Sequence, residues 1–296
     1  MVKRKNIIWL ILIIIAVVII TYLKERAPLT PTTDRHVTIL LDWYISQDQA
    51  PVLIADINGY FKQNNLDVKI VELSDPSIAP KLIANNQADL AISYGGSYQH
   101  QLQAGIAVKQ VGTLVDRPLN CLIYFSQSGI HSPQDLKGKR VGFTDPNDDF
   151  LLLKAVLKSG GLTMNDVTLI NIQSTLLQSL MLGKVDIATD MMRNIEPVVF
   201  AHHGFTSEMF CPENFNVPNY PELIYITHTG QTPDKINAFL QAVTEATRYI
   251  EQHPEEAWGK LKTTYPKFDT DIHHEIWQKT YPFFAHDPKK IESKRI

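Results

Sequence analysis

The sequence predicts an α/β protein made of two similar lobes and preceded by a membrane-spanning helix. After residue 36, strand-like and helix-like segments alternate, which is typical of a largely parallel sheet. Residues 81–92, KLIANNQADLAI, are echoed by residues 179–189, SLMLGKVDIAT. Both copies combine a helical turn, a stop at Asn or Gly, and an aspartate that leads into a strand. Two such copies about one domain apart indicate two α/β lobes with a cleft between them.

The third observation concerns the N-terminus. A basic cluster at residues 3–5 precedes an apolar run from Ile7 to Leu23, with Trp9 and Tyr22 near its ends. A helix of this length reaches about 25 Å, close to the thickness of the hydrocarbon layer. The YLKER sequence that follows lacks the small residues of a cleavage site. We therefore expect residues 1–26 to be an uncleaved anchor or signal, with a cleaved signal as the alternative.

The anchor is followed by a short tether and then by the lobes. Residues 27–36 contain two prolines and three threonines and predict an unstructured connection. The strand-like segments 121–125 and 223–227 flank the second copy of the repeat and are expected to be the crossovers between lobes. The predicted domains are lobe one at 37–122, lobe two at 123–222, and a helical return to lobe one at 223–296.

Each remaining element is assigned from its apolar pattern and its boundary residues. Val37 to Tyr44, VTILLDWY, is a β-branched run that predicts a strand buried on both faces. Helices are expected to stop at Asn-Gly or Gly-Gly pairs. The other predicted strands are 68–73, 89–94, 140–143 and 167–172, and the predicted helical segments are 51–59, 78–84, 133–136, 150–158 and the tail from 233.

The end of the first strand is the first candidate for a binding site. Asp42, Trp43 and Tyr44 come at its carboxyl end, where open α/β sheets bind ligands. A carboxylate beside flat rings suits a planar ligand with N–H donors. In the alternative interpretation, the two rings simply cap the core.

Composition and motifs exclude several other classes. The net charge is −3 and the sequence has no basic patch, which argues against a nucleic-acid partner. The sequence contains no phosphate-binding loop, no His-Glu-x-x-His motif and no nucleophile elbow. We therefore expect no catalytic residue, no metal and no cofactor. Cys121 and Cys211 could pair in an oxidising compartment, but their spacing does not require it, and we expect free buried thiols.

Ordered motifs along the chain after the tether resemble a known family. The matching segments are Leu41-Asp42-Trp43-Tyr44, Gly59-Tyr60-Phe61-Lys62, Ala88-Asp89-Leu90-Ala91-Ile92-Ser93-Tyr94, Pro118-Leu119-Asn120, Arg193-Asn194-x-Glu196 and Val217-Pro218-Asn219-Tyr220-Pro221-Glu222-Leu223. They are similar to periplasmic binding proteins for thiamine-pyrimidine precursors, the solute-binding components of ABC transporters. The wider group includes sulfonate-binding proteins and pyrimidine synthases.

The resemblance implies a type II periplasmic-binding-protein clamshell without catalysis. Such a receptor closes on a formylaminomethyl-, aminomethyl- or hydroxymethyl-pyrimidine and delivers it to a membrane permease driven by an ATPase. Glu222 is the first choice for a carboxylate that accepts two N–H bonds from an aminopyrimidine. The ligand-binding residues carried over are Asp42, Trp43, Tyr94, Asn120, Asn194, Glu196, Tyr220 and Glu222.

The chain departs from the family in the loop after Trp43. Gln49 stands where the pyrimidine synthases have a reactive histidine, and their cysteine-rich loop is absent. Both differences argue against a synthase. The ligand also stays open, because loop residues determine which small molecule fits. A sulfonate or a riboflavin-like ring is the alternative ligand, although Arg193 is the only cation among the predicted cleft residues that could meet an anion.

Overall fold

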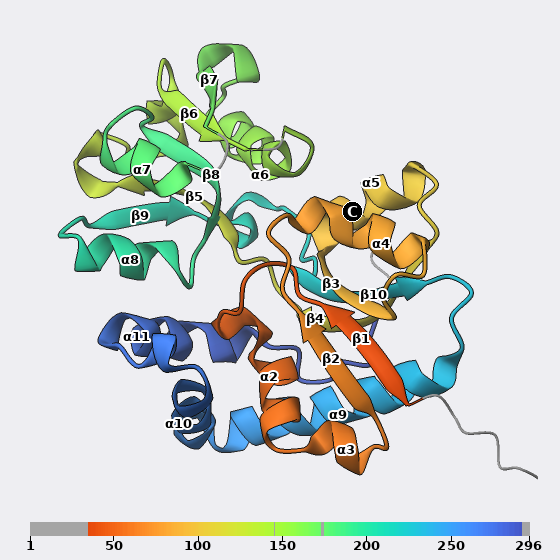
Figure 1. Cartoon of the computed structure of the whole chain (residues 1–296). Helices are drawn as coiled ribbons and strands as arrows, with labels where there is room; N and C mark the ends of the chain where they lie inside the picture. Colours follow the sequence, from red (N-terminus) through yellow and green to blue (C-terminus); the bar gives the residue numbers. More distant parts are fainter. Residues whose placement is uncertain (1–34, 145, 173–174, 292–296) are drawn as a thin grey trace, which may run out of the picture. The chain divides into compact units, whose positions relative to one another are not determined.

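The computed structural model describes residues 35–144, 146–172 and 175–291, with the side chains of 146–149 left out. These residues form ten strands in two five-stranded sheets (Figure 1). The predicted anchor at 1–26 and all but the last two residues of the tether lie outside the described residues. None of the helices within the described ranges combines the length and the apolar character needed to cross a membrane.

The first sheet has the order β2-β1-β3-β10-β4. Strand β1 is parallel to β2 and β3, whereas β10 runs antiparallel to β3 and β4. The carboxyl ends of β1 and β3 therefore meet the amino end of β10 at one edge of the sheet. The strands are β1 His36–Leu40, β2 Asp67–Val71, β3 Leu90–Tyr94, β4 Val108–Val115 and β10 Leu223–His228.

Helices cover both faces of this sheet. Alternate side chains of β1 separate the two layers: Ile39 packs in the large cluster with α2, α9 and α10, and Leu40 packs with α4. Both side chains are fully or almost fully buried. The helices around this sheet are α2 Ala50–Ile57, α3 Tyr60–Gln63, α4 Ala79–Ala84, α5 Gly95–Gln103, α9 Pro233–Gln252, α10 Pro254–Thr264 and α11 Asp271–Thr280.

The second sheet repeats this arrangement in the order β7-β6-β8-β5-β9. Tyr124 packs with α6 on one face, and Ile123 packs with α7 and α8 on the other. Its elements are β5 Asn120–Phe125, β6 Arg140–Phe143, α6 Pro146–Ser159, β7 Thr168–Asn171, α7 Leu176–Met181, β8 Ile187–Met192, α8 Glu196–His202 and β9 Ser207–Phe210.

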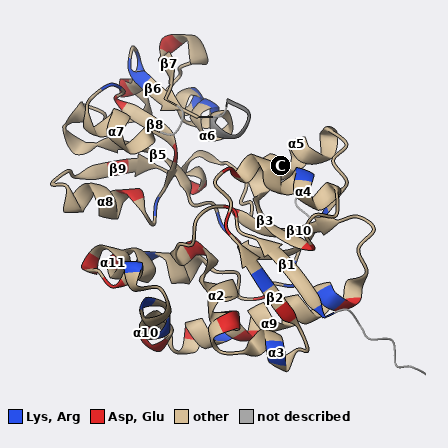
Figure 2. Cartoon of the chain, viewed as in Figure 1, with Lys and Arg blue, Asp and Glu red and all other residues tan. Residues whose placement is uncertain are grey.

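Short 3₁₀ helices connect many of these elements. They are η1 Gln47–Gln49, η2 Pro76–Ile78, η3 Ser126–Ser128, η4 Pro133–Leu136, η5 Met164–Asp166, η6 Pro212–Phe215, η7 Pro266–Phe268 and η8 Tyr281–Phe283. Charged side chains of both signs are distributed over the outer helices, as Figure 2 shows for α9 and α11.

The two copies of the sequence repeat make the same hydrogen bonds. Asp89, before β3, accepts a 2.8 Å bond from Thr38 N in the neighbouring strand β1. Asp186, before β8, accepts a 2.8 Å bond from Arg140 N in the neighbouring strand β6. In both lobes the aspartate thus bonds to the backbone of an adjacent parallel strand, which explains why the motif recurs.

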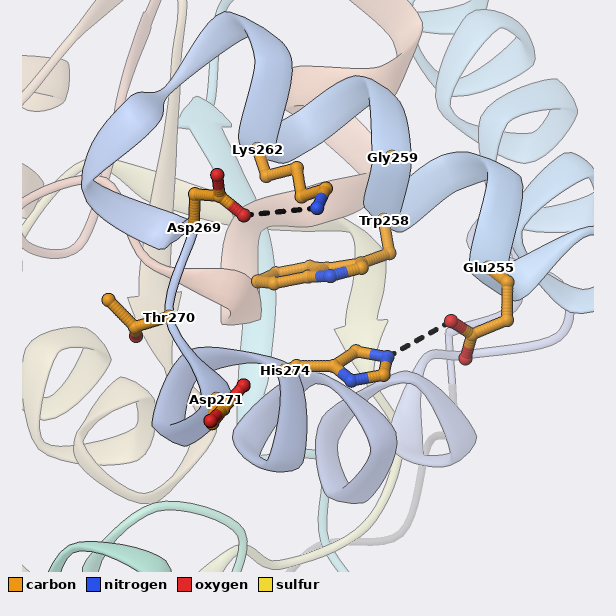
Figure 3. Close-up of a pocket in the computed structure, with 8 residues that line it drawn as sticks. All are labelled: Glu255, Trp258, Gly259, Lys262, Asp269, Thr270, Asp271 and His274. Atoms are coloured by element: carbon orange, nitrogen blue, oxygen red, sulfur yellow. Dashed lines mark hydrogen bonds and ion pairs between the residues drawn. The ribbon is translucent and has the colours of Figure 1, made fainter.

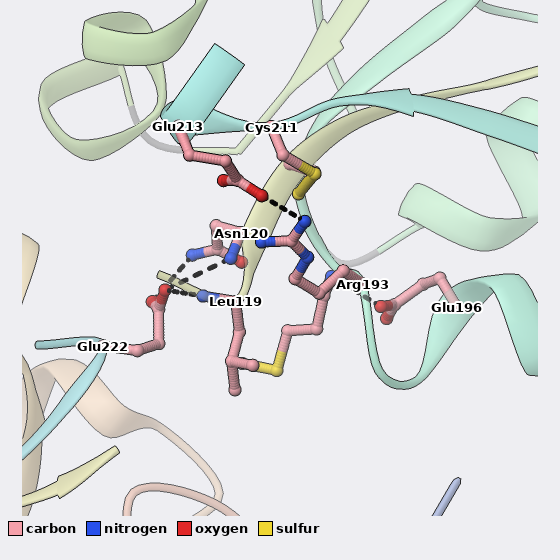
Figure 4. Close-up of a disulfide and its surroundings, with 9 residues drawn as sticks. Leu119, Asn120, Arg193, Glu196, Cys211, Glu213 and Glu222 are labelled. Atoms are coloured by element: carbon pink, nitrogen blue, oxygen red, sulfur yellow. Dashed lines mark hydrogen bonds and ion pairs between the residues drawn. A yellow bond between two sulfur atoms is a disulfide. The ribbon is translucent and has the colours of Figure 1, made fainter. Parts of the chain in front are cut away.

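Cys121 and Cys211 form a disulfide, so the expectation of free thiols is wrong. Strands β5 and β9 are antiparallel, and their register pairs Leu122 with Phe210. The cysteines, one residue outside this pair on each strand, therefore lie directly opposite each other (Figure 4). The sequence could not show this, because the two strands become neighbours only through the order of the folded sheet.

Candidate functional site

Three of the predicted site residues lie at one edge of the first sheet. Asp42 follows the end of β1, Tyr94 is the last residue of β3, and Glu222 immediately precedes β10. The antiparallel register pairs Leu223 with Tyr94, which places Glu222 beside the end of β3. The topology therefore gathers these side chains although up to 180 positions separate them in the sequence.

Asp42 is buried and held from two sides. Gln49 Nε2 donates to Oδ1 at 2.8 Å, and the Tyr94 hydroxyl donates to Oδ2 at 3.1 Å. Gln49 is itself fixed, because its amide oxygen accepts from Ser46 N in the capping box of η1. Burial raises the pKa of Asp42, and the two side-chain bonds oppose this rise. Burial and the Asp42 charge raise the pKa of Tyr94 well above its usual value, so the phenol stays a donor.

The two aromatic rings after Asp42 are exposed. Trp43 is 44% exposed and Tyr44 is 50% exposed, and the rings meet edge to face with centroids 5.5 Å apart. They do not cap the core, which rules out the alternative interpretation of these rings. Two large exposed aromatic side chains beside a buried carboxylate are typical of a binding surface.

Glu222 points into the protein and joins the start of β10 to the start of β5 (Figure 4). Its carboxylate accepts bonds from Leu119 N at 2.7 Å, from Asn120 N at 3.2 Å and from Asn120 Nδ2 at 3.0 Å. Its own backbone oxygen accepts from Gly95 N at 2.9 Å. A Cβ at Gly95 would lie 2.0 Å from the Pro221 oxygen, so only glycine fits this close approach. Glu222 and Asn120 are thus together, in an arrangement that holds the backbone.

Asn194 joins segments from distant parts of the chain. It is 1% exposed, and its Nδ2 donates to Asp48 Oδ1 at 2.9 Å and to Thr280 Oγ1 at 2.8 Å. Its Oδ1 is buried and accepts no hydrogen bond from any of the described residues. The predicted residue of the second lobe therefore meets η1 and the end of α11.

The other predicted residues take separate positions. Glu196, the first residue of α8, accepts a 2.6 Å bond from Met192 N. Tyr220 packs against the apolar cluster of the second sheet. Arg193 donates to Glu213 at 2.6 Å, and its guanidinium lies 5.8 Å from the Phe283 ring centre. The cation proposed for an anionic ligand is therefore paired with a carboxylate.

Acidic groups dominate the electrostatics of this region. Burial, followed by the charges of Asp42 and Glu222, raises the pKa of Asp48 to about 7. The exposed area of Glu196 is intermediate, yet neighbouring atoms crowd its carboxyl. That desolvation, with smaller contributions from Asp48 and Asp190, raises the pKa of Glu196 to about 8. We call Asp42, Asp48, Asp190, Glu196 and Glu222 the five-carboxylate cluster.

Raised carboxyl pKa values predict a stability that falls with increasing pH. The folded protein retains protons on Asp48 and Glu196 up to about pH 7 and 8, whereas the unfolded chain releases them near their ordinary values. The folded state thus binds more protons between about pH 5 and 8. We expect the free energy of unfolding to fall across this window, by at most about 1.4 kcal/mol per pH unit for each group.

Urea unfolding of the ligand-free protein at several pH values measures this slope. Glu196→Gln removes one titrating group and should flatten the slope, whereas Glu208→Gln, on β9, should leave it unchanged. A free energy of unfolding that rises with pH would contradict the assignment.

Sequence reasoning did not assign four residues that complete the site. Asp48 and Gln49 lie in the loop after Trp43, where the sequence shows only that Gln49 replaces the histidine of the synthases. Thr280 ends α11, and Asp190 has an unusual positive φ of 55° and accepts a 2.8 Å bond from Thr144 Oγ1. A signal was present for Asp48 and Gln49, because polar residues followed directly by an apolar helix suggest a buried polar turn.

A separate cavity of about 360 Å³ lies between α10 and α11 (Figure 3). The Trp258 ring stacks on His274 with centroids 5.5 Å apart, and His274 bonds Glu255 at 3.0 Å. Lys262 bonds Asp269 at 3.0 Å across the same region. None of the eight predicted site residues lines this cavity, and four of its ionisable groups form the two pairs described above.

Solved structures of low sequence identity share the fold. The periplasmic aliphatic sulphonate binding protein of Escherichia coli superposes with a TM-score of 0.67 at 15% identity, and the match covers 85% of each chain. With the two sheets described above, this likeness defines a two-lobed α/β protein of the periplasmic-binding-protein fold. The chain belongs to the NMT1/THI5-like family, whose model matches residues 46–257.

Relatives within the family carry different names. A Haemophilus influenzae protein named for thiamine biosynthesis is 37% identical over 261 residues, which cover 88% of this chain and 83% of the relative. The formylaminopyrimidine-binding protein of Halalkalibacterium halodurans is 27% identical, with 81% of this chain and 74% of the relative covered. The 4-amino-5-hydroxymethyl-2-methylpyrimidine phosphate synthase of Candida albicans is 28% identical, with coverages of 84% and 77%. The relatives thus carry the names both of a binding protein and of an enzyme.

Proposed function

We propose that this protein is the solute-binding component of an ABC importer and that it binds a thiamine-pyrimidine precursor. The observation that carries the proposal is the position of Asp42, buried at the end of β1, held by Gln49 and Tyr94, and followed by two exposed aromatic rings. The rings suit the faces of a pyrimidine, and the surrounding carboxylates suit its amino groups. The name of the formylaminopyrimidine-binding relative supports this ligand class.

The site would lie between the two sheets and draw on both. The proposed ligand contacts are Asp42, Trp43, Tyr94, Asn120, Asn194, Glu196 and Tyr220. Glu222 is assigned a structural role, in which it accepts the backbone N–H groups of Leu119 and Asn120. The proposed lobes are 37–122 with 223–296, and 123–222. Delivery would be to a membrane permease and its ATPase.

The proposed location is outside the cytoplasmic membrane, with residues 1–26 as anchor or uncleaved signal. The Cys121–Cys211 disulfide supports this location, because structural disulfides persist mainly in oxidising compartments.

Two alternatives are weaker on specific grounds. A sulfonate would enter a region rich in carboxylates, where Arg193 is already paired with Glu213. A pyrimidine synthase, as several relatives are named, would need its reactive histidine where Gln49 instead donates to Asp42. A riboflavin-like ring could use the aromatic surface, and a ligand screen distinguishes it.

Thermal unfolding of the full-length chain in detergent tests the proposal. A pyrimidine precursor at one hundred times its dissociation constant should stabilise the protein by about 2.7 kcal/mol, which raises the melting temperature by a few degrees. Trp43→Ala should weaken binding about tenfold through loss of ring contact. Leu182→Ala is the matched control, because Leu182 is 71% exposed and belongs to the end of α7.

A melting temperature raised only by an alkyl sulfonate or by riboflavin would overturn the ligand class and keep the receptor. Formation of a pyrimidine product in the presence of iron would instead favour the synthase.

A further inference from the structure

Several hydrogen-bond donors of the proposed site are committed to acceptors within the protein. The Tyr94 hydroxyl donates its single hydrogen to Asp42, and Gln49 Nε2 donates one of its two hydrogens there, while the Gln49 amide oxygen accepts from Ser46 N and Oγ. Asn194 Nδ2 donates both of its hydrogens, one to Asp48 and one to Thr280. Asn194 therefore has no hydrogen left to donate, and it retains only the capacity to accept.

The amide oxygen of Asn194 is a buried acceptor to which no described residue donates. The Thr280 hydroxyl donates to Ile276 O at 2.8 Å, so it can only accept from Asn194. This fixes the orientation of the amide, since a reversed amide would turn its oxygen towards the Asp48 carboxylate and towards an oxygen that is already an acceptor. The amide oxygen is left buried, and no described residue donates to it. A ligand that enters beside Asp48 would have to supply that donor.

The ionisable groups around the Asn194 amide oxygen are acidic. Asp42 contributes to the raised pKa of Asp48, and Asp48 contributes to the raised pKa of Glu196. Within the described ranges, no lysine, arginine or histidine side chain bonds to Asp42, Asp48 or Glu196. The described side chains also include no group of three acidic, histidine or cysteine residues able to hold one metal ion. An organic cation with several N–H donors fits these features better than a metal.

The three pyrimidine precursors differ in their charge and in the number of N–H and O–H donors on their substituent. An aminomethyl substituent is a protonated amine near neutral pH, with one positive charge and three donors. A hydroxymethyl group is neutral and has one donor. A formylaminomethyl group is neutral and adds a carbonyl acceptor, which would face the acceptors of the site.

Resting on the proposed function, we propose that the site selects the precursor with the protonated aminomethyl group. The carboxylates of Asp48 and Glu196 would balance its charge, and Asn194 Oδ1 would accept one of its N–H bonds. The aromatic rings beside Asp42 would contact the pyrimidine ring, as in the proposed function.

Calorimetric titration of the full-length chain with the three pyrimidines tests this selection at pH 7. We expect the aminomethyl compound to bind at least tenfold more tightly than either neutral compound. Its binding should release protons, because an ammonium ion lowers the pKa of adjacent carboxyls. The measured heat would then change with the ionisation enthalpy of the buffer.

The outcomes separate the two proposals. A neutral pyrimidine that binds as tightly as the aminomethyl compound overturns the selection and keeps the proposed function. Failure of all three pyrimidines to bind overturns both.

Variants test the role of the charge. Asp48→Asn keeps an oxygen for Asn194 but removes the charge, so binding of the aminomethyl compound should weaken at least tenfold while the neutral compounds change little. Glu196→Gln should act in the same direction, and it serves as a second test should Asp48→Asn fail to fold. Glu251→Gln, on α9 and bonded to His286, is the matched control for a lost charge. Equal weakening of all three pyrimidines by both site variants would contradict the proposal.

Discussion

Reduction of the Cys121–Cys211 disulfide is expected to lower the free energy of unfolding by about 4–5 kcal/mol. The bond closes a loop between positions 90 residues apart, and a loop of this length strongly restricts the unfolded chain. Both cysteines are 1% exposed, so the oxidised form should persist under mild reductant until the protein unfolds.

Urea unfolding of oxidised protein, and of protein reduced while unfolded and then refolded, measures the difference. Reduced wild-type protein is the best comparison because it retains both sulfur atoms. Cys121→Ala with Cys211→Ala should be destabilised further, since two buried side chains are shortened. Equal urea midpoints for the oxidised and reduced forms would contradict the expectation.

Replacement of Glu222 by alanine is expected to cost about 3 kcal/mol of stability. The carboxylate is 2% exposed and is the acceptor for Leu119 N and Asn120 N, which would lose their bonds within the protein. Glu222→Gln is the matched control: it keeps one oxygen for these amides and should cost about half as much, since its new amide nitrogen faces Asn120 Nδ2.

Urea unfolding and ligand titration of both Glu222 variants separate two roles for this residue. Loss of stability in Glu222→Ala indicates that the carboxylate holds the start of β5 against the start of β10. Full stability with loss of pyrimidine binding would instead restore the interpretation from the sequence, in which Glu222 contacts the ligand.

The sequence predicted local elements well where a single apolar pattern decided them. The strand at 140–143 has the bounds of β6, and the helix expected at 150–158 lies within α6. The strand expected from Val37 to Tyr44 ends at Leu40. Helix α5 was not predicted, because it begins with two glycines and has no clear apolar stripe.

The site was predictable only in part, for a physical reason. Asp42 and Tyr94 end neighbouring parallel strands, so the fold class alone brings them to one edge. The contact of Asn194 with Asp48 depends on how loops from different sheets meet, and no local pattern encodes it. The inward orientation of Glu222 is equally hidden, since a carboxylate before a strand can turn either towards the ligand or towards the backbone.

The exposed ring of Trp43 gives the protein an optical reporter of its own. Trp258 and Trp277 are buried and stacked on each other with centroids 6.1 Å apart, so among the described residues Trp43 is the indole that solvent reaches. A water-soluble quencher such as iodide would act on its fluorescence first. Any molecule that covers this ring would shield it, and occupancy could therefore be followed without a label.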